Sequence, residues 1–166
     1  MTKREMIYAK FGALEEELAH CYFLLHERFL ANPKLAKFWV ETAMEELQHS
    51  SILRFCRERG FMAEVDVDFK TYEKVEQLLE TVKGIVTDPD LSIDEAFYAS
   101  LLMESSELEE VYTKLTANLE KDHRLLFDAI RANLRSHHAT FAEAAAEFSR
   151  DRGLSEAFKN LGRVIS

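Results

Sequence analysis

The scarcity of glycine and proline is the feature that most constrains this chain, since its 166 residues include five glycines and two prolines. These residue types punctuate turns, so few turns are expected and the elements between them should be long. A sandwich or barrel of many short strands needs frequent turn signals and is therefore disfavoured. Apolar residues make up 47% and charged residues 31%, which is typical of a folded globular domain. The sequence predicts one all-α domain over residues 1–166.

Charge balance and cysteine content exclude several classes of partner and site. The 30 acidic and 21 basic residues give a net charge of -9, which argues against a nucleic-acid-binding surface. Cys21 and Cys56 are too few for a disulfide scaffold, and there is no CxxC pair. No stretch approaches the roughly 20 apolar residues that span a bilayer. With no apolar signal region behind the N-terminus, we expect a cytoplasmic protein that binds no membrane and no nucleic acid.

Helical spacing and capping signals predict a series of helices. Asn32-Pro33 is a helix start signal, because Asn caps a helix N-terminus and Pro fits its first position. Gly60 suits a helix end, and Ser92-Ile93-Asp94-Glu95 has the pattern of a capping box. The expected helices span residues 3–31, 33–59, 71–83 (ending at Gly84), 92–118, 123–152 (ending at Gly153) and 155–164.

The order of these helices predicts the architecture. Two pairs of long helices are each joined by a tight turn, which makes the partners in each pair antiparallel. The connection between the pairs, residues 61–91, is long enough to cross the whole length of a bundle, and residues 61–69 alternate as an extended segment would. This connectivity is that of a ferritin-like four-helix bundle with a long helix 2–helix 3 crossover and a short C-terminal helix.

Glu and His residues fall on helix stripes where a core would normally hold Leu. The stripe of helix 1 (Ala9, Gly12, Ala19, Phe23, Leu30) passes through a Glu, and the stripe of helix 2 passes through a Glu-x-x-His motif. Buried carboxylates are costly unless they are paired or bind a metal, and together with imidazole they suit iron, manganese or zinc. The candidate ligands are Glu16, Glu46, His49, Glu104, Glu107 and His137, with His138 as the alternative to His137 if helix 4 is rotated.

The candidate ligands are expected to lie in one layer of the bundle. With a rise of about 1.5 Å per residue, Glu16 and Glu46 lie roughly 24 Å and 20 Å from the turn that joins their helices. Glu104 and His137 lie roughly 21 Å and 22 Å from the second turn. The motif Glu120-Lys121-Asp122-His123 has the same Glu-x-x-His spacing but falls in that turn, so we expect it to be solvated.

The motifs Glu16-x-x-Ala19-x-x-x-Phe23, Glu46-Leu47-Gln48-His49, Glu104-x-x-Glu107 and His137 resemble the rubrerythrin branch of the ferritin-like di-iron superfamily, over roughly residues 5–145. The resemblance implies two iron ions, with manganese or zinc as alternatives, held by the six candidate ligands. It implies that Glu46 bridges the ions, that Glu107 is a mobile carboxylate, and that the protein reduces peroxide or activates dioxygen. Because members of this branch are commonly dimers, it also implies a homodimer.

The chain departs from the pattern of this family at three points. Leu134 stands where the fourth helix should carry a second bridging Glu, and Phe23 stands where the family often has Tyr. The rubredoxin module is absent, so a separate protein would have to donate electrons. Two other interpretations stay open: a metal-binding or sensing bundle without turnover, and a structural bundle with a vestigial site. A mononuclear site built on Glu16, Glu46 and His49 is the simpler form of the centre.

Overall fold

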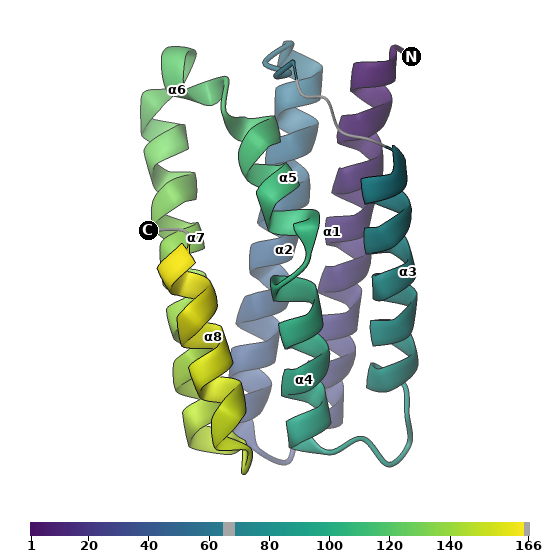
Figure 1. Cartoon of the computed structure of the whole chain (residues 1–166), viewed down its shortest axis with the longest axis vertical. Coiled ribbons are helices and arrows are strands. Elements are labelled where there is room, and N and C mark those ends of the chain that lie inside the picture. Colours follow the sequence, from purple (N-terminus) through teal and green to yellow (C-terminus); the bar gives the residue numbers. More distant parts are fainter. Residues whose placement is uncertain (65–68, 165–166) are drawn as a thin grey trace.

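A computed structural model describes residues 1–64 and 69–164, which form eight α-helices and no β-strand (Figure 1). The helices are α1 (Lys3–Arg28), α2 (Pro33–Arg59), α3 (Phe69–Val86), α4 (Ile93–Glu104), α5 (Glu107–Thr116), α6 (Leu119–Asp122), α7 (Arg124–Phe148) and α8 (Arg152–Val164). The predicted all-α class is confirmed. Helices α1, α2, α4 with α5, and α7 run alongside one another, α3 packs on α1 and α4, and α8 packs on α7 and α4 (Figure 1). Within the described ranges, no helix has the length and apolar content needed to cross a membrane.

The α1–α2 hairpin turns where the sequence predicts it. The side-chain oxygen of Asn32 accepts a hydrogen bond from the Leu35 N–H at 3.3 Å, and Pro33 is the first helical residue. Gly60 follows the last residue of α2 with φ of 76°, a left-handed conformation that glycine adopts without strain. The predicted helix over 33–59 is therefore confirmed, while α1 ends at Arg28 and not at residue 31.

The connection between α2 and α4 is more helical than predicted. Helix α3 covers Phe69–Val86 and not 71–83, because its buried apolar stripe continues from Val82 to Val86 past Gly84. Burial of that stripe outweighs the roughly 1 kcal/mol that a glycine costs inside a helix. No strand forms over the described residues of the predicted extended segment, and Phe69 already belongs to α3. Residues 65–68 of that segment lie outside the described residues.

The single helix predicted over 92–118 is wrong, because the structure divides it into α4 and α5. Helix α4 starts as predicted, with the capping box of Ser92 and Glu95. After Glu104 the helix stops, and Ser106, with extended backbone, begins α5 by accepting the Leu108 N–H on its hydroxyl at 3.2 Å. Serine hydroxyls compete with the backbone for such hydrogen bonds, which favours a helix end at consecutive serines.

The last long helix, α7, is shorter than the predicted range of 123–152. It ends at Phe148, where the Asp94 carboxylate accepts hydrogen bonds from the Ser149 hydroxyl at 2.7 Å and the Arg150 N–H at 2.9 Å. The chain then reverses, so that α8 runs back along α7 (Figure 1). Gly153 therefore lies inside α8 and does not end α7. The predicted C-terminal helix is confirmed, starting at Arg152 and not at residue 155.

An aromatic cluster fills the interior between α1, α2, α4 and α7. The Trp39 ring lies 4.7 Å from the Phe38 ring and 5.0 Å from the Phe97 ring, measured between centroids. Phe141 of α7 packs 5.2 Å from Phe38, and Phe158 of α8 stacks on Phe141 at 4.8 Å. Each fully buried ring of this size contributes roughly 2–3 kcal/mol. The cluster therefore fixes α7 and α8 against the α1–α2 hairpin.

Candidate metal centre

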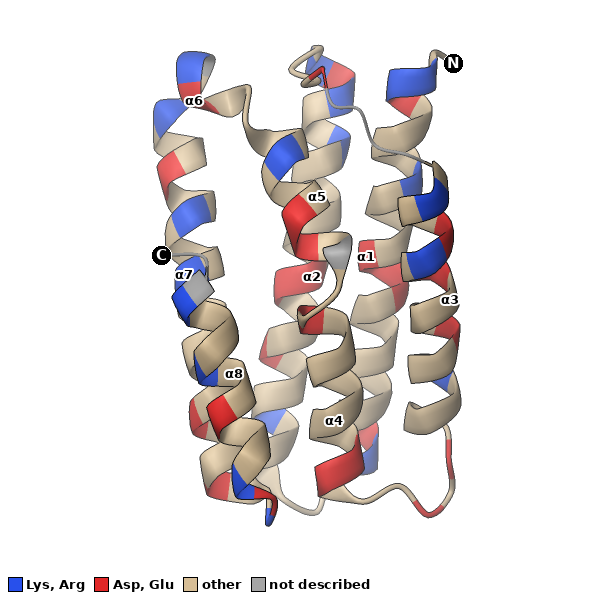
Figure 2. Cartoon of the chain, viewed as in Figure 1, with Lys and Arg blue, Asp and Glu red and all other residues tan. Residues whose placement is uncertain are grey.

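The acidic segments of α1, α2 and the α4–α5 junction lie at one level of the molecule (Figure 2). Inside this level, the described residues form three groups of Glu and His whose potential ligand atoms all lie within 4.8 Å of one another. The groups are Glu15, Glu46 and His49; Glu46, Glu104 and His137; and Glu104, Glu109 and His138. Neighbouring groups share a carboxylate, because Glu46 belongs to the first and second groups and Glu104 to the second and third.

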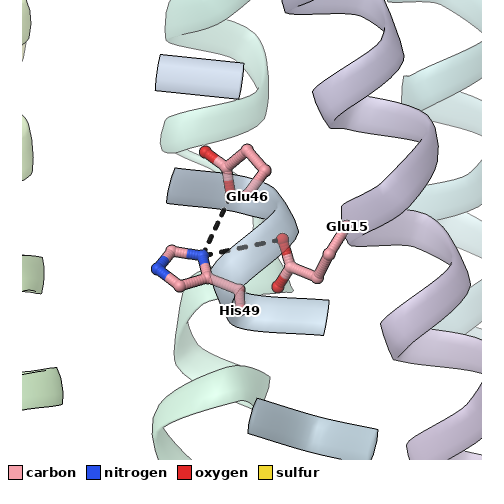
Figure 3. A group of neighbouring side chains, drawn as sticks. All are labelled: Glu15, Glu46 and His49. Carbon is pink, nitrogen blue, oxygen red and sulfur yellow. Dashed lines mark hydrogen bonds and ion pairs between the residues drawn. The ribbon is translucent and has the colours of Figure 1, made fainter. Parts of the chain in front are cut away.

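The first group comes entirely from the α1–α2 hairpin (Figure 3). His49 Nδ1 lies 2.9 Å from Glu46 Oε2 and 3.8 Å from Glu15 Oε2. All three residues are buried, with 2% of Glu15, 3% of Glu46 and 7% of His49 exposed. Among the described residues, His49 Nε2 has no hydrogen-bond partner. The group therefore holds two carboxylates and an imidazole that water does not reach.

Glu16, the predicted ligand of helix 1, does not belong to any of these groups. It is exposed, and its carboxylate accepts a hydrogen bond from the Ser50 hydroxyl at 2.7 Å. The buried face of α1 is centred on the bulky residues Tyr8, Phe11, Leu18, Tyr22 and Leu25. Glu15 lies on that face, whereas Glu16 lies about 100° further round the helix. The prediction that Glu16 faces inward is wrong, and the adjacent Glu15 takes its place.

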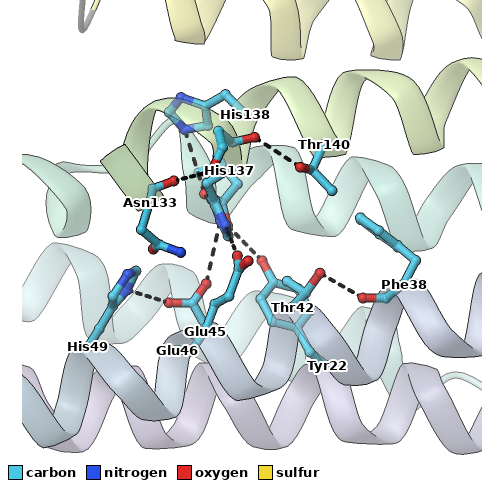
Figure 4. Close-up of polar contacts among 12 residues, drawn as sticks. Tyr22, Phe38, Thr42, Glu45, Glu46, His49, Asn133, His137, His138 and Thr140 are labelled. Atoms are coloured by element: carbon cyan, nitrogen blue, oxygen red, sulfur yellow. Dashed lines mark hydrogen bonds and ion pairs between the residues drawn. The ribbon is translucent and has the colours of Figure 1, made fainter. Parts of the chain in front are cut away.

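The second group joins α2 to α4 and α7 around His137 (Figure 4). His137 Nε2 lies 3.0 Å from Glu104 Oε2 and 3.7 Å from Glu46 Oε1. Its other ring nitrogen, Nδ1, lies 2.5 Å from Glu45 Oε2. The Tyr22 hydroxyl donates a hydrogen bond to Glu104 Oε1 at 2.9 Å. A tyrosine hydroxyl therefore does contact the buried carboxylates, but it comes from Tyr22 and not from position 23, where the resemblance indicates it.

The third group contains His138, so the structure brings both adjacent histidines into the interior. His138 Nε2 lies 2.9 Å from Glu109 Oε2 and 3.7 Å from Glu104 Oε2. His138 is buried because α8 covers its side of α7: a Cβ placed on Gly162 would lie 3.5 Å from the His138 Cβ. No pattern in the sequence indicates Glu109, since its approach depends on the break between α4 and α5. The side chain of Glu107 lies outside the described part.

The predicted solvated motif at the second turn has no place in this layer. Glu120 is exposed and forms an ion pair with Arg124 at 3.4 Å. The His123 ring packs on Phe61, with 4.3 Å between the centroids. Both residues have partners other than the buried carboxylates, in agreement with a role in the turn.

A small cavity, the inner cavity, lies between the first two groups. Its volume is about 20 Å³, and its lining includes Glu15, Glu46, His49, Glu104 and His137. A space of this size holds about one water molecule or one ion. Leu134, at the position of the expected second bridging carboxylate, also lines this cavity and leaves that wall apolar.

When no cation is bound, protons on the buried side chains balance the charges of the neighbouring carboxylates. Burial raises the pKa of Glu15 to about 8. Burial works to lower the pKa of His49, but the charges and hydrogen bonds of Glu46 and Glu15 together outweigh it and raise that pKa to about 10. Burial also works to lower the pKa of His137, but the charges and hydrogen bonds of Glu104, Glu45 and Glu46 together hold it well above its usual range. In the metal-free protein, protons therefore take the place that a cation would fill.

Comparison with known proteins yields no match: no protein family, no curated protein and no solved structure shows significant similarity to this chain. The membership of the rubrerythrin branch that the resemblance implies therefore has no support from a relative. The function has to be inferred from the residues of the chain itself.

Proposed function

We propose that this chain is a ferritin-like four-helix bundle, built from α1, α2, α4 with α5, and α7, that binds a pair of transition-metal ions. Glu15, Glu46 and His49 would hold one ion, and Glu46, Glu104 and His137 would hold the other. The observation that carries this proposal is that Glu46 belongs to both groups, with its two oxygens directed to different histidines. A carboxylate in that position can bridge two ions.

The donor set fits such a pair. Three buried carboxylates and two imidazoles are the mixture of oxygen and nitrogen ligands that suits iron, manganese or zinc. Ionising both Glu15 and Glu46 in this buried site is costly without a cation, and burial already raises the pKa of Glu15 to about 8. His49 Nε2 and the Tyr112 hydroxyl are buried and have no hydrogen-bond partner among the described residues. Polar atoms left in this state are typical of a site that a ligand completes.

The surrounding residues would position the ligands and exclude water. Bound iron or manganese would supply redox chemistry and Lewis acidity toward peroxide or dioxygen. Glu45 accepts a hydrogen bond from His137 Nδ1 and so fixes the ring with Nε2 toward the centre. The Tyr22 hydroxyl donates a hydrogen bond to Glu104 Oε1 and so orients that carboxylate, whose Oε2 faces His137. The Tyr112 ring lies 4.4 Å from the His49 ring and lines the cavity, so its hydroxyl can donate a hydrogen bond to a group bound there.

Substitution of the shared carboxylate tests the proposal. Glu46→Gln preserves size but removes the charge common to both groups, so it should bind two ferrous ions fewer per chain than the parent protein. Glu41→Gln is the matched control, because Glu41 lies on the same helix but is exposed and pairs with Lys37. Metal content after anaerobic loading and desalting gives the readout. Equal iron content in the parent and in Glu46→Gln would contradict the proposed pair.

The redox part of the proposal needs its own measurement. Iron-loaded parent protein, supplied with an electron-donor protein or a chemical reductant, should accelerate the loss of hydrogen peroxide, and Glu46→Gln should not. Iron-loaded protein without this activity would refute peroxide reduction while leaving metal binding intact. That outcome would favour a binding or sensing role, for which the apolar wall at Leu134 is the specific observation.

A further inference from the structure

The third group of ligands lies beside the proposed pair but is not part of it. His138 is 1% exposed, and its Nδ1 has no hydrogen-bond partner among the described residues. Its Nε2 faces Glu109 Oε2 at 2.9 Å as an ion pair. The other carboxylate oxygen, Glu109 Oε1, is also buried without a hydrogen bond in the described part of the chain. Buried polar atoms without partners destabilise the folded protein, and a bound ligand would satisfy them.

The break between α4 and α5 is what assembles this group. In a continuous helix, Glu104 and Glu109 would project about 140° apart around the axis and could not reach one ligand. The helix end at Ser105 and the new start at Ser106 reorient α5. Carboxylate oxygens of Glu104 and Glu109 therefore lie within 4.8 Å of each other and of a nitrogen of His138.

A second cavity, the outer cavity, connects this group with the surface. It has a volume of about 490 Å³, and its lining includes Glu104, Glu109, His138 and exposed residues of α5 and α7. Glu104, Glu109 and Leu134 also line the inner cavity of the proposed pair. The third group therefore stands between solvent and the buried centre.

The charges around the outer cavity are compatible with a cation at its inner end. Arg131 and Arg135 line it, but both are exposed, so water screens their charges. The carboxylates of Glu104 and Glu109 lie deeper, with 6% and 15% of their side chains exposed, and their charges are screened less. Two carboxylates and one imidazole again form a ligand set suited to a divalent transition-metal ion.

We propose that Glu104, Glu109 and His138 bind a third divalent transition-metal ion, reached from solvent through the outer cavity. Binding at this site is independent of whether the proposed pair exists. One consequence rests on the proposed function: because Glu104 is a ligand in both places, the third site is the position from which an ion passes to the pair.

Titration of the metal-free protein with Co²⁺ tests the third site. Three ions per chain are expected for the parent, and two for Glu109→Gln and for His138→Gln, as measured by equilibrium dialysis and elemental analysis. Glu110→Gln is the matched control, because Glu110 lines the same outer cavity but is exposed and pairs with Lys114. It should keep all three. Parent stoichiometry in both Glu109→Gln and His138→Gln overturns the proposal.

Two further measurements separate this site from the pair. The loss of one ion on Glu109→Gln substitution is expected whatever the number bound elsewhere, and Glu46→Gln should still retain one Co²⁺. Should His138→Gln fail to fold, as judged by circular dichroism, crystals of the parent soaked with Co²⁺ decide. An anomalous scattering peak between the three side chains supports the site, and peaks only at other positions overturn it.

The role of the site in loading is tested by rate. If ions pass through it, the pair should fill at least tenfold more slowly in Glu109→Gln than in Glu110→Gln, as followed by stopped-flow absorbance of bound Co²⁺. An unchanged rate in a variant that has lost the third ion overturns the transfer role and leaves the binding site standing.

Discussion

Replacing Glu15 by glutamine should stabilise the metal-free protein and weaken the metal-loaded one. Glu15 is buried against His49 and Glu46, and it is the residue of α1 that faces the centre. Glutamine has the same shape but no charge. The neighbouring substitution Glu16→Gln, on the exposed side of the same turn, removes the same charge from the chain and serves as the control.

The size of the effect follows from the pKa of Glu15, which burial raises from its ordinary value of 4.5 to about 8. A carboxyl group with a raised pKa favours the folded state below pH 4.5 and loses that contribution as the pH rises to 8. Each pH unit in this window costs about 1.4 kcal/mol. At pH 7 the loss is on the order of 3 kcal/mol, and glutamine abolishes it. The metal-free variant should therefore be more stable by an amount of that order.

Urea denaturation at pH 7, with chelator or with excess Mn²⁺, measures both the gain in stability without metal and the loss with metal. We expect Glu15→Gln to gain stability in chelator and to lose most of the stabilisation that Mn²⁺ gives the parent. Glu16→Gln should change the free energy of unfolding by less than about 1 kcal/mol in both conditions. Lower stability of metal-free Glu15→Gln would contradict this expectation. So would a Glu16→Gln variant that gains stability in chelator and loses it with Mn²⁺.

Three other outcomes are expected. Leu134→Glu, which supplies the second bridging carboxylate to the inner cavity, should tighten metal binding in calorimetry, and unchanged binding would show that Leu134 does not limit the centre. Apparent metal affinity should rise at least about tenfold per pH unit from pH 6 to 8, since the His49 proton, with a pKa of about 10, must leave on binding; a flat profile contradicts this. Trp39→Ala should cost about 3–5 kcal/mol in urea denaturation, because the ring is fully buried; a loss below 1 kcal/mol contradicts it.

Local signals in the sequence predicted helix boundaries where a specific side chain performs the capping. Asn32, Gly60 and Ser92 act as the pattern indicated, because an N-cap or a left-handed glycine needs only its immediate neighbours. The helix ends predicted at Gly84 and Gly153 are wrong, since Gly84 lies inside α3 and Gly153 inside α8. A glycine marks a helix end only where packing does not hold the next turn in place.

The sequence indicated which side chains lie together where two candidates share one helix face, and it was incomplete where separate elements had to be aligned. Glu46 and His49 lie one turn apart on α2, so their pairing follows from the spacing alone. The choice between Glu15 and Glu16 depends on the rotation of α1. The small residues Gly12 and Ala19 of the predicted stripe are buried, but the bulky buried residues, Tyr22 among them, define the rotation of α1 better.

The third group could not be predicted, because it depends on two features of tertiary structure. Glu109 reaches Glu104 only through the break at the two serines, and His138 is buried only because α8 folds back over α7. Neither feature changes the apolar periodicity of its helix. The choice between His137 and His138 assumed that α7 has one buried face. In the structure two sides of α7 are buried, because α8 covers the side that carries His138.

The α1–α2 hairpin also has a consequence for the order of folding. It carries every ligand of the first group, and its two helices pack along their length across a tight turn. Contacts close in sequence form sooner than distant ones, so this hairpin should assemble before α7 docks. An ion captured there would be held by a partly folded chain and would bias it toward the native arrangement. Metal supplied during refolding should therefore speed the reaction, and metal supplied afterwards should only slow unfolding.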